Sequence, residues 1–385
     1  MRNNQKLSVL VWLNKQKEKN GQLPIYFRIS VDGKKATIAT QHFVHPKYWD
    51  KKNKRVKSNA PDSYQINGII DRTKNDLQQR FLDFCSRGKL TSAQELKQLH
   101  LDSYPMVDAV KPVLSPYKLV SRELQAHDSV VSIGGVKVGG GKFTVIAGPC
   151  SVESQDQLFG VAEMIKEQGV PLLRGGAFKP RTSPYSFQGL GLEGLKLLKA
   201  ARKQYQLPVV SEIIDPSDAD LMYDYIDCYQ IGARNMQNFR LLEAVGKQDK
   251  AVLLKRGMSA TLEELLLAAE YIINAGNPNV ILCERGIRTF ETATRNTLDL
   301  NAVAYLKEKS HLPVFVDPSH GTGVKSLINP LSRAAVAVGA DGIIVESHLN
   351  PKEALSDGHQ ALTADDFSQL MADIKPFVAA AGKQL

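Results

Sequence analysis

Four residues of types that bind metals stand at the ends of apolar runs or in the segments just beyond. They are Cys150, His320, Glu346 and Asp357. A thiolate, an imidazole and two carboxylates form a mixed soft and hard set, which suits Mn, Fe, Co or Zn better than Mg. Taken singly, a buried cysteine is usually a small apolar residue and a lone histidine a hydrogen-bonded core residue. Their convergence on one site favours metal binding, with Cys150 as the thiolate.

Cationic residues crowd the same positions. They are Arg174, Lys179, Arg181, Arg234, Lys255, Arg256 and Arg285. Burying them unpaired is costly, so they predict anionic ligands and above all phosphates, which Arg binds through two hydrogen bonds and Lys as a point charge. The alternative is a set of internal salt bridges to Glu212, Glu284 and Asp317. The cations outnumber these carboxylates, which favours bound anions.

The segment 175–184 has the composition of a phosphate-binding loop. It reads Gly175-Gly176-Ala177-Phe178-Lys179-Pro180-Arg181-Thr182-Ser183-Pro184. Its glycines permit backbone conformations that expose amide groups, and two cations and two hydroxyls lie beside them. We therefore expect this loop to hold a phosphorylated compound.

Eight short apolar runs between Phe143 and Ser347 carry these residues. They cover residues 144–147, 171–173, 208–210, 228–231, 251–254, 279–282, 313–316 and 342–345. Each run ends in charged, Cys, His or Gly residues and is followed by a helical stretch. Continuous β-branched runs are typical of parallel strands buried on both faces. The pattern predicts an α/β fold, a (β/α)₈ TIM barrel, with its chemistry at the carboxyl ends of the strands.

The rest of the barrel region is conventional. Helical spacing of apolar residues predicts helices over 238–245, 261–274, 296–307, 330–338 and 363–381. A hairpin pattern around Gly134-Gly135 leads into the first barrel strand. In a barrel such a hairpin commonly closes the bottom, so we expect a structural role for it.

The residues before the barrel differ in composition. Residues 1–105 contain 20 Lys and Arg against 9 Asp and Glu, whereas the rest of the 385-residue chain contains 29 against 31. This asymmetry suggests an arm for nucleic acid or another polyanion, although a charged run is also a common solvated surface. Alternating residues predict a small antiparallel sheet over 7–44, and apolar spacing predicts helices over 62–85 and 92–101. A small N-terminal α+β domain therefore precedes the barrel.

This N-terminal pattern resembles the arm-type DNA-binding domain of tyrosine recombinases over about residues 5–100. The resemblance rests on the strand-turn-strand pattern, the Pro46-x-x-Trp49-Asp50 element and the long polar helix after it. No catalytic recombinase domain follows, so recombination is not expected. Weak DNA binding through the arm is a hypothesis, and the chain is a natural fusion protein, an engineered regulatory swap or an assembly artefact.

Cysteine usage and hydropathy indicate a compartment. The four cysteines, at 85, 150, 228 and 283, have no clustered spacing and so form no disulfide framework. The apolar run 7–13 is too short for the core of a signal peptide, and no stretch approaches the roughly 20 apolar residues of a membrane span. We expect a cytoplasmic protein that has no membrane partner.

Seven motifs resemble 3-deoxy-D-arabino-heptulosonate 7-phosphate (DAHP) synthase, type Iβ, from about Pro116 to the C-terminus. They are Gly148-Pro149-Cys150-Ser151, Leu173-Arg174-Gly175-Gly176-Ala177, Lys179-Pro180-Arg181-Thr182-Ser183, Gln230-Ile231-Gly232-Ala233-Arg234-Asn235, Leu254-Lys255-Arg256-Gly257, Cys283-Glu284-Arg285-Gly286 and Asp317-Pro318-Ser319-His320. The resemblance implies a transferase that condenses phosphoenolpyruvate with erythrose 4-phosphate, the first step of the shikimate pathway and of aromatic amino acid biosynthesis. It also implies a divalent metal (Mn, Fe, Co or Zn) and a homo-oligomer, a tetramer.

The resemblance further implies a role for each residue. The implied metal ligands are Cys150, His320, Glu346 and Asp357, and phosphoenolpyruvate is surrounded by Arg174, Lys179, Glu212, Gly232, Ala233, Arg234, Lys255 and Arg285. Erythrose 4-phosphate meets Lys179, Pro180, Arg181, Thr182, Ser183 and Asp317. A Lewis-acidic metal polarises the aldehyde as the enol carbon attacks, while the cations neutralise the anionic groups. Lys179 is the candidate proton donor to the aldehyde oxygen, and with Cys150 and His320 it forms the predicted catalytic set.

Three segments follow from these patterns. Residues 1–103 are the basic arm-like domain, 104–128 a connector and 129–385 the catalytic barrel with its hairpin. The connector looks like the last strand of the ferredoxin-like regulatory domain that begins many type Iβ enzymes. Neither that domain nor a chorismate mutase domain is whole here, which removes the basis for expecting feedback control by Phe or Tyr.

Two alternatives stay open. 3-Deoxy-manno-octulosonate 8-phosphate synthase resembles the same barrel and uses the same enol donor with arabinose 5-phosphate. Its family typically has a Lys-Ala-Asn-Arg-Ser-Ser loop in place of residues 179–183, and this loop reads the acceptor sugar. The second alternative is a DNA-binding protein whose barrel is incidental, which salt-sensitive binding to duplex DNA would support.

Overall fold

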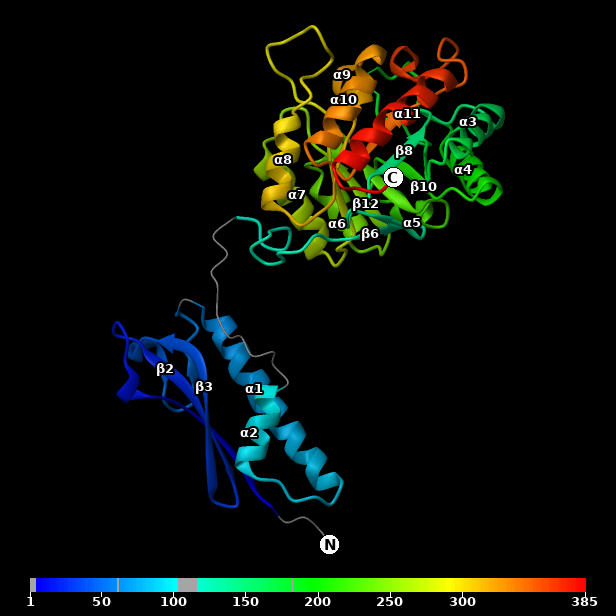
Figure 1. Ribbon diagram of the computed structural model, residues 1–385. Coiled ribbons are helices and arrows are strands. Elements are labelled where there is room, and N and C mark those ends of the chain that lie inside the picture. The colour runs from blue at the N-terminus through cyan, green and yellow to red at the C-terminus, as the bar shows by residue number, and fades with distance from the viewer. Residues whose placement is uncertain (1–4, 61, 103–115, 182) are drawn as a thin grey trace. The chain divides into compact units, whose positions relative to one another are not determined.

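The computed structural model describes residues 5–60, 62–102, 116–181 and 183–385. The chain divides into two compact units, Met1–Pro112 and Val113–Leu385, and Figure 1 colours them from blue at the N-terminus to red at the C-terminus. The predicted boundary at residue 103 and much of the connector predicted over 104–128 lie outside the described residues.

A three-stranded antiparallel sheet forms the base of the N-terminal unit. Its strands pair in the order β1 (Leu7–Leu13), β2 (Leu23–Val31) and β3 (Lys34–Val44). Asp32 and Gly33 turn the chain between β2 and β3 with φ of +48° and +83°, the left-handed conformation that Asp-Gly supplies in a two-residue hairpin. The predicted N-terminal sheet is confirmed.

Two helices pack on one face of this sheet (Figure 1). They are α1 (Ser63–Ser86) and α2 (Ala93–Asp102), and the short strands β4 (Trp49–Asp50) and β5 (Arg55–Val56) and the 3₁₀ helices η1 (Lys15–Lys17) and η2 (Pro46–Tyr48) complete the unit. Phe27 of β2 is fully buried in a cluster with Ile70 and Leu77 of α1. The alternate residues Leu10, Trp12 and Arg28 are exposed or half-buried, because successive side chains of a strand point to opposite faces.

Eight parallel strands close into a barrel in the second unit. In barrel order they are β8 (Thr144–Gly148), β9 (Leu172–Arg174), β10 (Val209–Ile213), β11 (Cys228–Ile231), β12 (Ala251–Lys255), β13 (Val280–Glu284), β14 (Val314–Val316) and β15 (Gly342–Glu346). Every strand residue is buried, as expected for parallel strands covered outside by helices and filled inside by side chains. Each strand overlaps one predicted apolar run, so the (β/α)₈ barrel is confirmed.

Helices surround the barrel (Figure 1). They are α3 (Gln155–Glu167), α4 (Leu192–Tyr205), α5 (Asp218–Tyr223), α6 (Phe239–Gly246), α7 (Leu262–Asn274), α8 (Leu300–Lys309), α10 (Lys325–Ala337) and α11 (Ala364–Ala380), with the short η3 (Ala233–Asn235), α9 (Pro318–Thr322) and η4 (Gly358–Gln360) at strand ends. Two predicted starts were wrong. α8 begins after Asp299, which caps it, and α10 begins before Pro330, which lies inside the helix although proline favours a first turn.

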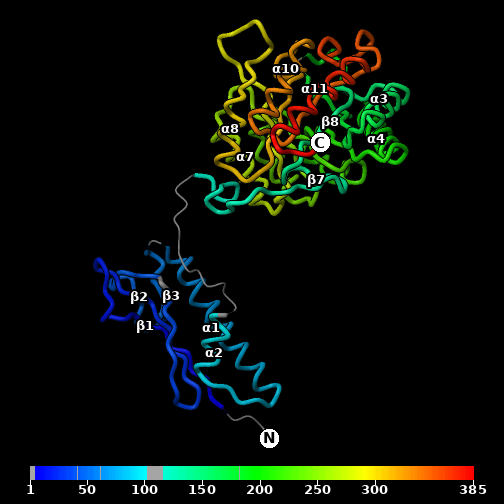
Figure 2. The backbone as a smooth tube through the Cα atoms, viewed as in Figure 1, coloured from blue at the N-terminus to red at the C-terminus, as the bar shows by residue number. Residues whose placement is uncertain are grey.

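The hairpin before the barrel closes its amino-terminal end. β6 (Val131–Ile133) and β7 (Val136–Val138) pair antiparallel, and Val131 and Ile133 share an apolar cluster with Cys228 and Ala251, the first residues of β11 and β12. The carboxyl ends of the strands are therefore the open end of the barrel. In the backbone trace the yellow segment between β13 and α8 projects from the barrel (Figure 2). Among the described residues, no helix has the length and apolar character to cross a bilayer.

Candidate active site

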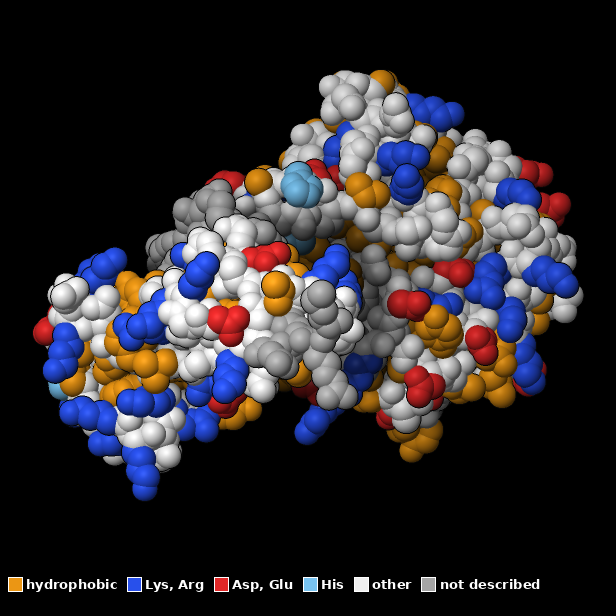
Figure 3. All heavy atoms as spheres, turned by 90° about the horizontal axis from the view of Figure 1, so that it is seen from below, with side chains coloured by type: hydrophobic (Ala, Val, Ile, Leu, Met, Phe, Trp, Pro, Cys, Tyr) orange, Lys and Arg blue, Asp and Glu red, His pale blue; other side chains and the backbone are white. Residues whose placement is uncertain are grey.

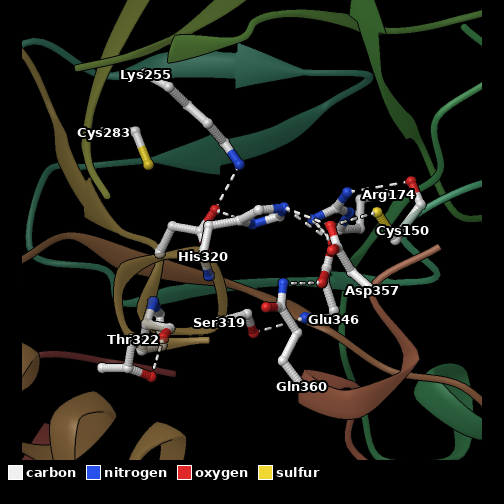
Figure 4. A network of polar contacts seen from close by, with 12 residues as sticks. Cys150, Arg174, Lys255, Cys283, Ser319, His320, Thr322, Glu346, Asp357 and Gln360 are labelled. Atoms are coloured by element: carbon white, nitrogen blue, oxygen red, sulfur yellow. Dashed lines mark hydrogen bonds and ion pairs between the residues drawn. The ribbon is translucent and has the colours of Figure 1, made fainter. Parts of the chain in front are cut away.

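The four predicted metal ligands lie together at the carboxyl end of the barrel (Figure 4). Cys150 comes two residues after β8, His320 lies in α9 after β14, Glu346 ends β15, and Asp357 immediately precedes η4. Their ligand atoms all lie within 4.8 Å of one another. Residues separated by up to 207 positions in the chain thus meet at one point.

The donor atoms are close enough to share one ion. Nε2 of His320 lies 3.1 Å from Oε1 of Glu346 and 3.8 Å from Oδ2 of Asp357. Sγ of Cys150 lies 3.4 Å from the same Oδ2. Oε1 of Glu346 is buried and has no hydrogen-bond partner, which is a costly arrangement without a cation. The thiol, imidazole and carboxylate donors therefore fit a borderline divalent metal.

The protonation of Cys150 depends on its surroundings. Burial, followed by the negative charge of Glu346, raises the pKa of the Cys150 thiol to about 12, against the opposing charges of Lys179 and Arg174. The thiol therefore keeps its proton at neutral pH until a cation replaces it.

The two carboxylates, in contrast, are ionised. Burial would raise the pKa of Glu346, but His320 and Arg174 outweigh it and the pKa is lowered. Burial would also raise the pKa of Asp357, but His320 and Arg295 outweigh it in the same way. The site thus presents two negative charges and a neutral thiol to a cation.

Asp317 orients the ring of His320. Its Oδ2 accepts the Nδ1–H of His320 at 2.8 Å, and its Oδ1 accepts the backbone N–H of the same residue at 2.9 Å. Nζ of Lys255 lies 2.5 Å from this Oδ2. Burial would raise the pKa of Asp317, but His320 and Lys255 hold it well below its usual value. Because Nδ1 carries the proton, Nε2 is free to bind a metal.

A cavity of about 300 Å³ opens beside the four ligands. Predicted residues that line it are Lys179, Pro180, Arg181, Ser183, Glu212, Gly232, Ala233, Arg234, Lys255, Arg285, His320 and Asp357. Thr182 lies outside the described residues. Arg174 and Asp317 are not among the lining residues, since Arg174 contacts Glu346 and Asp317 lies against His320 and Lys255. The roles assigned to all of these residues stay predictions.

Two buried arginines have donors without partners. Nε and Nη1 of Arg174 and Nη1 of Arg285 are buried and make no hydrogen bond, although Nη1 of Arg174 lies 3.3 Å from Oε1 of Glu346. Burial lowers the pKa of Arg285, against the opposing charge of Asp317. Such donors are costly to bury unless an anion accepts them. They are therefore suited to a phosphate or carboxylate ligand.

Arg256 behaves differently from the other predicted cations. Its Nη1 donates to Glu284 at 2.9 Å and lies 3.0 Å from Asp299. It does not line the cavity. The internal salt bridge that was the alternative interpretation therefore describes Arg256, and in part also Lys255 with its partner Asp317.

Lys179 joins the metal ligands to the cavity. Its Nζ lies 3.2 Å from both Sγ and the carbonyl oxygen of Cys150, and its side chain lines the cavity. Burial would lower the pKa of Lys179, but the neighbouring Cys150 and Glu212 raise it overall. The ammonium group therefore keeps a proton that it can donate.

Gly232 leaves room for the carboxylate of Glu212. A Cβ at Gly232 would lie 2.0 Å from Oε1 of Glu212, far closer than contact distance. A side chain at position 232 would therefore require the carboxylate of Glu212 to move.

A model of the DAHP synthetase I family matches residues 121–378. The chain belongs to this family. A phospho-2-dehydro-3-deoxyheptonate aldolase of Thermotoga maritima is 56% identical over 281 residues, which are 73% of this chain and 83% of that protein. A 2-dehydro-3-deoxyphosphooctonate aldolase of Syntrophotalea carbinolica is 33% identical over 248 residues, 60% of this chain and 88% of that protein.

Solved structures agree with the assignment to the DAHP synthetase I family. The crystal structure of the Thermotoga maritima DAHP synthase has a TM-score of 0.69 and 54% identity, covering 74% of this chain and 84% of that one. A truncated form of the enzyme has a TM-score of 0.66 and 53% identity, covering 70% of this chain and 98% of that one. An arm DNA-binding domain model matches residues 11–97. The predicted resemblances to DAHP synthase and to an arm DNA-binding domain are confirmed, and the type Iβ subtype stays a prediction.

Several residues at this DAHP synthetase site were missed by the sequence analysis. Gln230, Met258, Ser186 and Arg295 also line the cavity. Nε2 of Gln360 donates to Oε2 of Glu346 at 2.6 Å, which leaves Oε1 for the metal. Gln230 lay within a recognised motif. Arg295 lies in a loop and Gln360 ends η4, away from the strand ends on which the prediction was based.

Proposed function

We propose that this chain condenses phosphoenolpyruvate with erythrose 4-phosphate to give DAHP and inorganic phosphate, the first step of the shikimate pathway. One observation carries the proposal: four residues that could hold a metal ion cluster together, and two of them, His320 and Asp357, line a cavity whose wall is rich in cations. The 56% identity to a heptonate aldolase supports it. Both substrates are phosphorylated, which accounts for the excess of positive charge in the wall.

Phosphoenolpyruvate binds to the Arg and Lys side chains at the cavity. Arg234, Lys255 and Arg285 line the cavity, and Arg174 presents unpaired donors beneath it. Guanidinium groups bind phosphate and carboxylate through paired hydrogen bonds, whereas an ammonium acts as a point charge. Glu212, Gly232 and Ala233 form the adjoining wall.

Erythrose 4-phosphate binds over the loop that contains Lys179, Pro180, Arg181, Thr182 and Ser183. Nε of Arg181 donates to the carbonyl of Phe187 at 3.0 Å, and its Nη2 donates to Oγ of Ser356. These contacts hold the guanidinium at the cavity, where it binds the acceptor phosphate. Asp317, assigned to the same substrate, acts through Lys255 and His320, which line the cavity.

The reaction joins C3 of phosphoenolpyruvate to the aldehyde carbon of erythrose 4-phosphate. Cys150, His320, Glu346 and Asp357 would hold a divalent metal, which would supply Lewis-acid polarisation of the aldehyde. Lys179 donates the proton that the aldehyde oxygen gains, and the water that adds at C2 returns one proton to Lys179 and passes its second proton to the departing phosphate. Cleavage of the C2–O bond then releases phosphate, whose charge Arg174, Arg234 and Arg285 neutralise.

Phosphate release with each acceptor sugar tests the function. We expect release from phosphoenolpyruvate with erythrose 4-phosphate and not with arabinose 5-phosphate, because the segment 179–183 lacks the loop sequence typical of octulosonate enzymes. The reverse preference would favour the octulosonate reaction, to whose enzymes the barrel is about 30% identical.

Chelation tests the metal requirement. We expect EDTA to abolish phosphate release and added Mn, Fe, Co or Zn to restore it. Cys150→Ala removes one of the four ligands and is expected to abolish the restored activity. Unchanged activity of this variant would contradict the metal assignment.

Assembly and location complete the proposal. The enzyme assembles as a homo-oligomer, a tetramer by resemblance, and works in the cytoplasm, where the free cysteines found in the described residues stay reduced. Residues 1–103 act as an arm domain, 104–128 as a connector and 129–385 as the catalytic domain.

DNA binding by the N-terminal unit is a second candidate function. On the face of the sheet opposite the helices, the guanidinium of Arg28 lies 4.8 Å from the ring centroid of Trp12, and Trp12 lies 5.6 Å from Tyr26. Figure 3 shows Lys and Arg side chains gathered around apolar ones on the N-terminal unit. A basic, aromatic sheet face suits a nucleic-acid groove, and the arm DNA-binding model matches the same residues.

Fluorescence anisotropy with a labelled duplex tests this second function. We expect affinity to fall steeply with salt, and Arg28→Ala to weaken binding and lower the salt slope by about one unit. Arg72→Ala, an exposed arginine of α1, is the matched control. If the anisotropy does not rise at low salt, DNA binding is contradicted. This result has no bearing on the enzyme activity.

A further inference from the structure

The carboxylate of Glu153 lies where three loops of the active site meet. Its Oε1 accepts the Oγ–H of Ser151 at 3.0 Å and the backbone N–H of Leu355 at 2.9 Å. Its Oε2 lies 3.7 Å from Nε2 of His348. Only 10% of the side chain of Glu153 and 9% of that of His348 are exposed. A buried carboxylate with these contacts is fixed in place.

Each contact is next to a different metal ligand in the chain. Ser151 follows Cys150 directly, His348 is two residues after Glu346, and Leu355 is two residues before Asp357. Three of the four proposed ligands are therefore connected through one side chain that does not belong to the ligand set.

In the contact between His348 and Glu153, an N–H of the imidazole faces the carboxylate. Nδ1 of His348 accepts the backbone N–H of Asn350 at 3.0 Å. A neutral imidazole therefore carries its proton on Nε2, the atom that faces Glu153. The pair is longer than a hydrogen bond but lies within reach of an electrostatic attraction.

The loop that contains Asp357 is tied to the rest of the site mainly through side chains, since Ser356 contacts Cys150 and Arg181. Its backbone–backbone hydrogen bonds near Asp357 are local, among them those from Ala354 to Pro351 and from Gln360 to Asp357. Asp357 also has φ of +51°, a conformation that costs energy for a residue with a side chain. The bond from Leu355 to Glu153 fastens this loop to the segment after β8.

We propose that Glu153 is a positioning residue of the metal centre, which holds Cys150, Glu346 and Asp357 in register without binding metal or substrate. The inference rests on the proposed function, since it presupposes the metal site. Residues that orient ligands typically change metal affinity about 10–100-fold when they are removed. Glu153→Ala leaves the four ligand side chains intact and removes only the carboxylate that connects the segments of three of them.

Titration of the metal-free full chain with Co²⁺ tests the proposal directly. Thiolate-to-cobalt absorbance reports binding at Cys150 without any turnover. We expect Glu153→Ala to weaken Co²⁺ binding about 10–100-fold. Glu153→Gln is expected to weaken Co²⁺ binding less than Glu153→Ala, because its amide oxygen can still accept both hydrogen bonds of Oε1 while its NH2 group loses the attraction to Nε2–H of His348. Glu163→Ala, an exposed glutamate of α3, is the matched control and is expected to bind normally.

The possible outcomes distinguish the proposed metal site from the positioning role of Glu153. Absence of the thiolate band in the unmodified chain, or its persistence in Cys150→Ala, would overturn the proposed metal site. A normal band that Glu153→Ala leaves at full affinity would overturn the positioning role alone. If circular dichroism shows that Glu153→Ala does not fold, Glu153→Asp is measured instead. Its shorter side chain withdraws the carboxylate, so we expect weaker Co²⁺ binding, and normal binding would again overturn the role.

Discussion

Asp317 accepts the Nδ1–H of His320 at 2.8 Å, so that Nε2 of the same ring faces Oε1 of Glu346 at 3.1 Å. The bond selects one tautomer and one ring orientation before any metal arrives. A carboxylate behind a ligating histidine also increases the basicity of the ring. The orientation of the His320 ring is therefore determined by Asp317, which is fully buried.

Replacing Asp317 by Asn tests this relationship. The amide keeps the shape but loses the charge that faces both His320 and Lys255. We expect metal affinity to fall about 10–100-fold, measured by calorimetric titration of the metal-free protein. Asp215→Asn, at an exposed position, is the control. Unaltered affinity in Asp317→Asn would show that the aspartate serves Lys255 rather than the metal.

Lys179→Gln tests the proton donor. The amide preserves most of the volume, but it has no proton to give to the aldehyde oxygen. We expect kcat to fall by about 10²–10⁴ in a stopped assay of phosphate release, with metal affinity largely retained because Lys179 is not a ligand. Lys199→Gln, on the exposed face of α4, serves as the comparison. A loss of kcat smaller than about tenfold would rule out the role.

Gly232→Ala tests the packing between Gly232 and Glu212. The new Cβ would lie 2.0 Å from Oε1 of Glu212, so the carboxylate must move. Because this atom ends a flexible side chain, we expect a small change in melting temperature. Displacement of the Glu212 carboxylate, which lines the cavity, is expected to raise the KM for phosphoenolpyruvate on the order of tenfold to a hundredfold. Gly68→Ala meets no atom within 4 Å and should leave KM unchanged, and the same result for Gly232→Ala would contradict the prediction.

The barrel and the position of the four proposed metal ligands were predictable because their signals are local. Cys150 lies two residues after a buried strand and Glu346 ends another, and in a parallel barrel all such ends meet on one face. The length and order of the apolar runs were therefore enough to locate the open end of the barrel, without any knowledge of side-chain contacts.

The supporting residues were not predictable in the same way. Glu153 and Arg295 lie in loops and Gln360 ends the short η4, and their partners are determined by the fold of other segments rather than by a sequence period. The start of α10 was misplaced for a related reason: Pro330 is a good signal for a first turn, but neighbouring contacts outweigh the hydrogen bond that it forgoes.

His311, which contacts the segment that leads into the barrel, has a lowered pKa. Nε2 of His311 lies 2.7 Å from the carbonyl oxygen of Leu119, so it is the donor, and Nδ1 lies 2.8 Å from Oγ of Ser129. Burial lowers the pKa of His311, opposed by the bond to Leu119 and supported by the charge of Arg122. The folded chain therefore favours the neutral ring.

The sign of the pH effect follows from this lowered pKa. The unfolded chain binds a proton on His311 near pH 6.5, whereas the folded chain binds it only at lower pH, so the stabilisation is complete above that value and is lost as the pH falls below it. His127 and Asp128 also face the ring, with opposing effects on its charge. We expect the melting temperature to drop between about pH 7.5 and pH 5.5, and His311→Gln to show a smaller drop because its amide does not titrate. His359→Gln, a histidine outside this cluster, is the control, and an equal drop in His311→Gln and the unmodified chain would assign the effect to other groups.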